Sequence, residues 1–227
     1  MNRDSNAYTF FFATLMVLVV ASTLAFTASS LKELQSSNVR KEKMQNILAT
    51  IGINSDRDQA EKLYRKHITA ELALTQSGAV DKKVNAFQIK LSSEIKKPIS
   101  EQRFPIYEAD LDGNKYYIIP LRGAGLWNAI WGYVALEDDK NTIKGAVFDH
   151  KGETAGLGAE ITQQWFQDSF LGEKVFDSNG NLVGINVSKT NNDPDGIDKD
   201  DNEVDAISGA TITGDGVTDM IKERLQN

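Results

Sequence analysis

One stretch near the start of the chain restricts most strongly what this protein can fold into, because it carries no charge. No charged residue occurs between Asp4 and Lys32, and residues 10–28 are almost entirely apolar. Nineteen residues of α-helix rise about 28 Å, close to the thickness of a bilayer's hydrocarbon core. We therefore expect residues 1–31 to form a single transmembrane anchor in contact with the lipid bilayer.

A cleaved signal peptide is the competing interpretation of this segment. The apolar core of a signal peptide is usually only about 7–15 residues and follows a basic start. Here Arg3 is offset by Asp4 and the apolar run is longer, although small residues at 28–30 leave cleavage open. The retained anchor is favoured. The basic residues that follow the span, taken alone, favour a cytoplasmic location for the rest of the chain.

Composition excludes several kinds of chemistry. The 227 residues carry a net charge of -7, which argues against a nucleic-acid partner because phosphate binding needs a basic face. The chain has no cysteine, so disulfides, thiolate metal sites and iron–sulfur ligation are excluded. With only two histidines, a histidine-rich zinc site is not expected either. Any redox chemistry must come from a bound organic cofactor.

Helical periodicity continues after the apolar run. Apolar residues recur at helical spacing over residues 31–51, and Gly52 is a plausible stop. Ser55 can cap a second helix that extends to about Ser77. His67 lies on the apolar face of that helix, and we interpret it as a packed residue rather than a ligand. These segments define an expected helical region over residues 32–80.

Strand patterns replace helical ones after Gly78. A turn is expected at residues 112–114 and a loop at residues 96–105. A helix is expected over residues 160–171, and a final helix capped by Thr213 or Asp215 would face Val217, Ile221 and Leu225 inward. The expected strands are residues 86–91, 115–121, 130–136, 142–149 and 182–188. We predict an α+β fold with a mainly antiparallel sheet over residues 81–227.

The acidic segment 191–203 invites comparison with a calcium-binding loop. With Gly196 at the sixth position, the twelfth is Asn202 instead of the bidentate glutamate, and Pro194 lies inside the loop. We interpret the segment as a solvated acidic loop and assign no metal site. The glycine-rich segments 123–125 and 156–158 do not complete a dinucleotide-binding or phosphate-binding motif either.

The segment 205–211 precedes the final helix. Read by itself, its small residues indicate a tight turn. Thr211 lies next to the expected helix start, where free backbone N–H groups and the helix dipole favour an anion. A phosphate carried on Thr211 would therefore be well placed.

Three motifs resemble those of a known family. Residues 205–211 read D-A-I-S-G-A-T and resemble the flavinylation motif D-x-x-S-G-A-T of FMN-binding domains. Residues 123–133 resemble that family's G-x-G-L-W-x-x-x-x-G-Y segment, and residues 153–158 resemble its E-T-P-G-L-G segment, with Ala155 in place of proline. Ala159 stands where a further glycine is common. With the apolar run, the order of motifs is similar to the NqrC family of sodium-translocating NADH:quinone reductases.

The resemblance implies a covalently bound FMN. In that family a flavin transferase cuts FAD and joins FMN through a phosphoester to the last threonine of the motif, here Thr211. Thr154 would hydrogen-bond the flavin, and an apolar wall would stack on it, although Trp127 and Leu157 as plain core and Glu153 as a turn cap stay open. The implied cofactor-binding residues are Leu126, Trp127, Glu153, Thr154, Gly156, Leu157, Gly158, Asp205, Ser208, Gly209, Ala210 and Thr211.

The resemblance also implies a function. The chain would be the electron-transfer subunit of a sodium-pumping NADH:ubiquinone reductase, relaying electrons from an iron–sulfur centre to a second flavin. It would cross the bacterial inner membrane once, with the large domain in the periplasm among other subunits of the complex. That orientation conflicts with the basic residues Lys32, Arg40, Lys41 and Lys43 after the span.

Three alternatives stay open at this point. The first is the homologous FMN-binding subunit of an Rnf-type ferredoxin:NAD complex, whose attachment motif is similar. The second is a membrane-tethered binding module without a redox role, and the third is an assembly factor that carries no flavin. The segment 125–127 and the following pair Gly132 and Tyr133 favour the quinone reductase.

Overall fold

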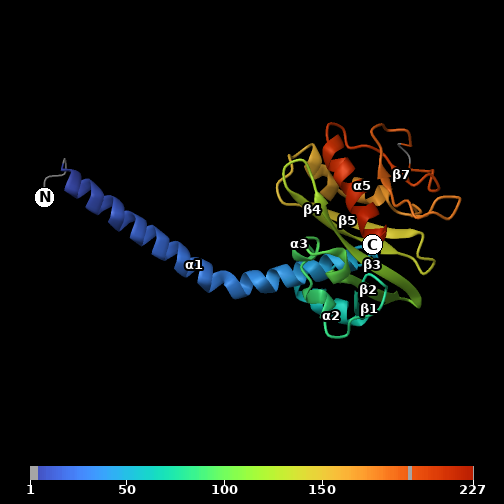
Figure 1. Cartoon of the computed structure of the whole chain (residues 1–227), viewed down its shortest axis with the longest axis horizontal. Coiled ribbons are helices and arrows are strands. Elements are labelled where there is room, and N and C mark those ends of the chain that lie inside the picture. Colours follow the sequence, from blue (N-terminus) through green and yellow to red (C-terminus); the bar gives the residue numbers. More distant parts are fainter. Residues whose placement is uncertain (1–4, 194–195, 227) are drawn as a thin grey trace. The chain divides into compact units, whose positions relative to one another are not determined.

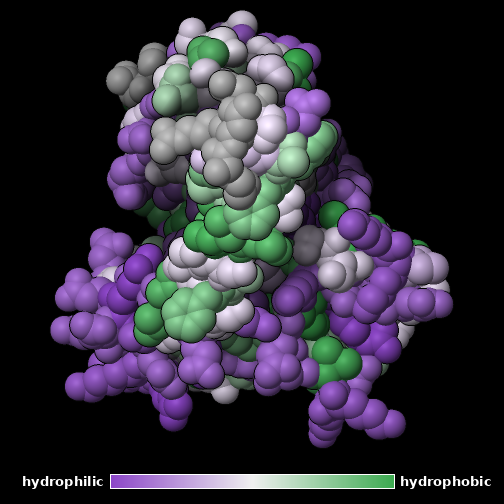
Figure 2. All heavy atoms as spheres, turned by 90° about the vertical axis from the view of Figure 1, so that its left-hand side faces the viewer, coloured by the Kyte–Doolittle hydropathy of each residue, from purple (hydrophilic) through white to green (hydrophobic). Residues whose placement is uncertain are grey.

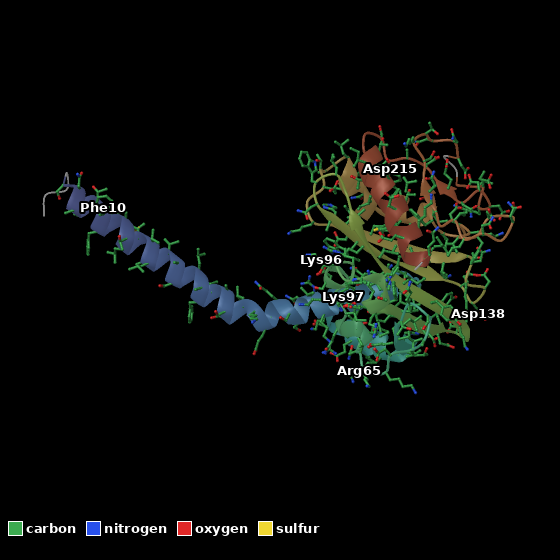
Figure 3. The ribbon with its side chains drawn as sticks, in the orientation of Figure 1. Phe10, Arg65, Lys96, Lys97, Asp138 and Asp215 are labelled. Carbon is green, nitrogen blue, oxygen red and sulfur yellow. The ribbon has the colours of Figure 1, made fainter. Side chains whose placement is uncertain are left out.

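The computed structural model describes residues 5–193 and 196–226, and the chain divides into two compact units, Met1–Lys43 and Met44–Asn227. From Asn6 onward the first unit consists of helix α1 (Asn6–Ala49), which is long and apolar enough to cross a membrane. Hydroxyls in this helix bond back to its backbone, since Thr23 and Thr27 each donate to the carbonyl four residues earlier at 2.8 Å. Its apolar side chains are exposed, among them Phe10 (Figure 3), and Figure 2 shows apolar surface on the face of the molecule that it presents.

The second unit begins within α1. Met44, Ile47 and Leu48 are buried in this unit, and the chain turns after α1 at Gly52, whose φ is 83°. Helix α2 (Arg57–His67) follows, and His67 is buried with Nδ1 3.2 Å from the carbonyl oxygen of Asp110.

The prediction of one helix from Ser55 to Ser77 was wrong at both ends. Asp56 occupies the N-cap position, and the chain leaves the helix at His67 to enter strand β1 (Ile68–Leu74). The sequence of β1, ITAELAL, fits the alternation of a strand as well as the periodicity of a helix. Pairing with the next strand decides between these two structures.

Five antiparallel strands form one meander in the order β1-β2-β3-β4-β5 (Figure 1), which confirms the predicted α+β class. Asp112 and Gly113, both with positive φ, form the β2–β3 turn, as predicted. Asp138 lies in the turn between β4 and β5 (Figure 3). The other strands are β2 (Phe104–Leu111), β3 (Asn114–Ala124), β4 (Ala129–Leu136) and β5 (Ile143–His150).

The sheet separates two apolar cores, because successive side chains of a strand point to opposite faces. Ile118 packs with the end of α1 and with α2, whereas its neighbour Ile119 belongs to the other core. That second core contains the final helix α5 (Thr211–Gln226), with Val217 and Ile221 fully buried as predicted. Figure 1 shows α5 and α2 on opposite sides of the sheet.

A glycine allows the close approach of α5 to the sheet. A Cβ at Gly216 would lie 2.2 Å from the carbonyl oxygen of Ala124, so any side chain there would push the helix away from β3. The helix begins at Thr211, so the prediction of a cap at Thr213 or Asp215 was wrong. Thr213 is buried inside the first turn.

Short elements connect the strands and replace two predicted strands. Residues 86–91 contain a 3-10 turn capped by Asn85, whose side chain accepts from the Gln88 N–H at 3.1 Å. Only Asn186–Val187 of residues 182–188 forms a strand, because Gly184 has φ 71°. The remaining elements are η1 (Ala86–Gln88), α3 (Leu91–Glu94), η2 (Ile99–Glu101), η3 (Gly158–Thr162), α4 (Gln164–Ser169), β6 (Asn186–Val187) and β7 (Glu203–Val204).

Candidate cofactor site

Three segments that are distant in sequence meet around a cavity of about 240 Å³. They are the β3–β4 connection, the loop after β5 and the segment that leads into α5. The resemblance assigned all three segments to the cofactor, and the fold brings them together. The cavity is lined by Leu126, Glu153, Thr154, Leu157, Gly158, Gly209, Ala210, Thr211, Ile212 and Thr213.

Glu153 connects these segments. Its carboxylate is buried and accepts hydrogen bonds from the backbone N–H groups of residues 126–128, at 3.2, 3.0 and 3.2 Å. It also accepts a bond from Oγ1 of Thr213 at 2.7 Å. Burial opposes ionisation, but these donors outweigh it and hold the pKa of Glu153 below its ordinary value. Glu153 is therefore ionised at neutral pH and fixes the loop against the helix.

Two glycines serve this packing. A Cβ at Gly158 would lie 2.5 Å from Thr213 Oγ1 and 2.6 Å from Glu153 Oε2. A Cβ at Gly125 would lie 2.7 Å from Glu153 Oε1. The resemblance implied that Gly158 lets the backbone approach a flavin ring. The structure supplies a second reason for this glycine, since it makes room for the buried carboxylate.

Thr211 is exposed and is the first residue of the 16-residue helix α5. Backbone N–H groups in the first turn of a helix have no partner within it, and the helix dipole is positive there. Gly209 turns the chain just before the helix with φ 72°, and a Cβ at this position would lie 2.8 Å from Leu157. Thr211 itself lines the cavity, and a phosphate attached to it at the start of α5 would be favoured electrostatically.

The segments around the cavity carry four exposed apolar side chains, and all of them except Trp127 line it: Leu126, Trp127, Leu157 and Ile212. Trp127 is 68% exposed, so it does not belong to the core, and its indole N–H donates to Thr154 Oγ1 at 3.1 Å. Ile212 was not predicted to belong to the site, and Thr213 was predicted as a helix cap or a competing hydroxyl. The sequence did contain a signal for Ile212. It is an apolar residue that directly follows the motif and precedes the inward-facing positions of α5.

Four residues implied by the resemblance do not line the cavity. Trp127 is not a lining residue, although it directly follows Leu126, which lines the cavity. Gly156 is exposed, with φ 76°, and donates from its N–H to Glu160 at 3.1 Å. Ser208 is exposed in the turn before α5. Asp205 accepts from the N–H groups of residues 192 and 193 at 2.8 and 3.2 Å and lines a different, larger cavity.

That larger cavity has a volume of about 570 Å³, and its lining includes six carboxylates and one lysine. A phosphate-bearing cofactor would meet strong like-charge repulsion there. The smaller cavity contains one carboxylate, which is already saturated with donors. Among the described residues, the charges of the smaller cavity are therefore compatible with a phosphate-bearing cofactor, and those of the larger one are not.

Comparisons with known proteins agree with this geometry. Residues 125–226 match the model of the FMN-binding domain family. The NqrC protein of the Na(+)-translocating NADH-quinone reductase of Vibrio anguillarum is 31% identical over 232 residues, which cover 95% of this chain and 89% of the relative. The corresponding protein of Haemophilus ducreyi is 29% identical and covers 97% and 90%.

Two solved structures extend the comparison to the fold. The NqrC structure from Parabacteroides distasonis has a TM-score of 0.76 at 36% identity, covering 86% of this chain and 93% of that one. The NqrC structure from Shewanella oneidensis has a TM-score of 0.67 at 27% identity, covering 81% and 90%. The chain therefore belongs to the NqrC family of Na(+)-translocating NADH-quinone reductase subunits and contains an FMN-binding domain.

Proposed function

We propose that this chain is a membrane-anchored electron-transfer subunit that carries FMN as a phosphoester on Thr211. The observation that carries the proposal is the position of Thr211, an exposed hydroxyl at the start of α5 and at the edge of the 240 Å³ cavity formed by the three motif segments. The names of the relatives favour the quinone reductase over an Rnf-type complex.

The residues present fit this cofactor. Leu126, Leu157 and Ile212 offer apolar surface to a ring, and Trp127 extends that surface beside Thr154. The first turn of α5 favours the phosphate charge. Glu153 contacts no cofactor in this proposal, because its oxygens are occupied by the loop and by Thr213; it positions both.

Attachment needs a flavin transferase as partner. Thr211 Oγ1 forms a bond to the phosphorus of the FMN half of FAD, the pyrophosphate P–O bond breaks, and AMP leaves while the hydroxyl proton passes to solvent or to the transferase. When bound, FMN supplies one-electron transfer between an iron–sulfur centre and a second flavin held by neighbouring subunits. The chain itself supplies the tether, the anion-favouring helix start and the apolar wall.

We propose further that α1 anchors the chain in the inner membrane, with residues after the span in the periplasm. The support is the apolar helix together with membership of the NqrC family. A phosphatase reporter that is active only outside the cytoplasm, fused after Asn227, should be active in cells. Activity from a cytoplasmic reporter alone would place the domain on the other side.

The test of cofactor attachment is the fluorescence of the denatured polypeptide. The full chain is produced with and without a flavin transferase and separated on a denaturing gel under ultraviolet light. We expect a fluorescent band at the mass of the chain only when the transferase is present. A colourless band in both samples would contradict a covalent flavin and favour a binding or assembly role without redox chemistry.

A further inference from the structure

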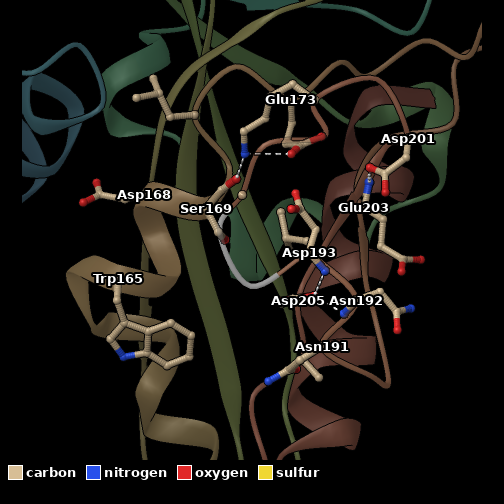
Figure 4. Close-up of a pocket in the computed structure, with 15 residues that line it drawn as sticks. Trp165, Asp168, Ser169, Glu173, Asn191, Asn192, Asp193, Asp201, Glu203 and Asp205 are labelled. Carbon is tan, nitrogen blue, oxygen red and sulfur yellow. Dashed lines mark hydrogen bonds and ion pairs between the residues drawn. The ribbon is translucent and has the colours of Figure 1, made fainter.

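The 570 Å³ cavity is separate from the proposed flavin site and has no role in the function described so far. Figure 4 shows it between the short helix α4, which carries Trp165 and Asp168, and the acidic loop before β7. Its carboxylate-bearing residues are Asp168, Glu173, Asp193, Asp201, Glu203 and Asp205, and its one basic residue is Lys199.

Glu173 is the unusual member of this set, because its side chain is only 1% exposed. Its Oε1 pairs with Nζ of Lys199 at 3.0 Å, whereas its Oε2 is buried and has no hydrogen-bond partner. A buried carboxylate oxygen without a donor costs free energy. Oε2 has almost no accessible surface, but Glu173 lines the cavity, so a donor would approach this oxygen from the cavity when the surrounding side chains shift.

Lys199 shows which kind of donor the cavity accepts. Its ammonium group donates to the carbonyl oxygen of Ser169 at 2.8 Å and to Glu173 at 3.0 Å. A carbonyl and a carboxylate at these distances make a binding position for an alkylammonium group, and this one is filled by the chain itself.

The remaining charges in the cavity are not balanced. Within the described part of the chain, Glu173 is the only one of the six carboxylates that pairs with a cation. The others accept from neutral donors, such as Asn186 for Glu203 and the backbone for Asp193. Burial and the neighbouring carboxylates Asp198, Glu203 and Asp193 raise the pKa of Asp201, as expected where negative charge accumulates.

The geometry favours an organic cation over a metal ion. No group of three or more carboxylates or imidazoles among the described residues is arranged to hold a metal ion. The cavity volume also exceeds what a bare ion fills. Trp165, which is 53% exposed at the edge of the cavity, offers an aromatic face that attracts cations.

We propose that this cavity binds a linear alkylammonium cation with more than one charge, one end of which reaches Glu173 Oε2 while the chain passes the carboxylates toward Trp165. Such a group can come from a free polyamine or from lysine side chains of a partner protein. The proposal does not depend on flavin attachment at Thr211.

The experiment is calorimetric titration of the full chain at pH 8, where Glu173 is mostly ionised, in nonionic detergent, with spermidine and separately with a short acetylated peptide containing two lysines. We expect saturable binding of one equivalent of at least one of the two probes. Tighter binding of spermidine indicates a free polyamine, and tighter binding of the peptide indicates a partner protein. Absence of saturable binding by both probes would overturn the proposal.

Variants separate this cavity from general attraction to an acidic protein. Glu173→Gln and Asp201→Asn each remove one charge from the lining, and Asp138→Asn removes the same charge from the β4–β5 turn. We expect each cavity variant to weaken binding at least about fivefold and the control to change it less than about twofold. Thermal unfolding of each variant verifies that it is folded. Equal effects in all three would show only nonspecific attraction and overturn the assignment.

Discussion

Thr213 donates a hydrogen bond from Oγ1 to Oε2 of Glu153 at 2.7 Å, and the two residues lie 60 positions apart in the chain. The same carboxylate holds the backbone of residues 126–128. One ionised side chain therefore fixes two of the segments that line the proposed flavin cavity, and the third segment carries that side chain. The organisation of the cavity depends on this residue without requiring it to touch a cofactor.

Replacing Glu153 by glutamine should destabilise the second unit and loosen the cavity. The amide NH₂ would face donors where a carboxylate oxygen accepted them, and we expect a loss of about 2 kcal/mol in the free energy of unfolding. Chemical unfolding of the full chain measures it. Glu160→Gln is the control, because Glu160 is less buried and accepts one backbone N–H, from Gly156. Equal losses in both variants would contradict a special role for Glu153.

The unfolding stability should depend on pH through Glu173. Burial raises the pKa of Glu173 to about 7, although Lys199 opposes the shift. The folded chain then binds this proton more tightly than the unfolded chain, so stability falls as pH rises from about 4.5 to about 7. Glu173→Gln removes this dependence and should be more stable than the parent at pH 8 by roughly 1–2 kcal/mol, with no gain at pH 4.5. The same difference at both pH values would contradict this assignment.

Trp127→Ala should change the flavin and not the fold. Because Trp127 is 68% exposed, its loss should cost less than about 0.5 kcal/mol of unfolding free energy. We expect altered flavin absorbance and fluorescence in the flavin-loaded chain. Trp165→Ala is the matched control, since Trp165 is 53% exposed and lies at the acidic cavity. An unchanged flavin spectrum in Trp127→Ala would remove this side chain from the proposed site.

Sequence patterns predicted the class of the fold and the strands of strong alternation, such as residues 130–136. They failed where two periodicities fit equally, as in residues 68–74, and where pairing alone decides the structure. Strand β2 was not predicted because Pro105 indicated a break. The structure accommodates this proline because β3 begins to pair with β2 only at Tyr107, so the missing N–H at Pro105 leaves no gap in that ladder.

The three motifs identified most of the candidate site, but not how it is held together. Thr211, Thr154 and Leu157 were found by resemblance and do line one cavity. The bond between Glu153 and Thr213 was not predicted, because it depends on where α5 begins relative to the sheet. The periodicity of neither segment indicates where α5 begins relative to the sheet. Asp205 belongs to the motif by sequence yet lines the acidic cavity.

The apolar part of α1 should be retained on the mature chain. Residues 10–28 are long enough to span a bilayer, and helix α1 continues without interruption to Ala49. Cleavage after a signal sequence would cut inside this helix. Amino-terminal sequencing of the chain purified from membranes should therefore find the start at or near Met1. A start close to Leu31 would identify the segment as a removed signal peptide.

Thr211→Val should abolish covalent flavin while the fold is kept. Valine preserves the shape of the side chain but has no oxygen with which to bond phosphorus, and Thr211 is exposed, so little stability is at stake. Thr211→Ser keeps a hydroxyl and should retain part of the attachment. The chain is made with the transferase, denatured, and examined for fluorescence.

Fragment mass spectra of the flavin-bearing peptide distinguish Thr211 from the neighbouring hydroxyls. Ser208 is exposed and is the accessible competitor, whereas Thr213 is buried and bonded to Glu153, so its hydroxyl is not free to react. We therefore expect Ser208→Ala to keep the flavin on Thr211. Flavin found on residue 208 or 213, or a fluorescent Thr211→Val chain after denaturation, would reassign the attachment. The start of α5 would then stabilise the phosphate electrostatically, and another residue would be its point of attachment.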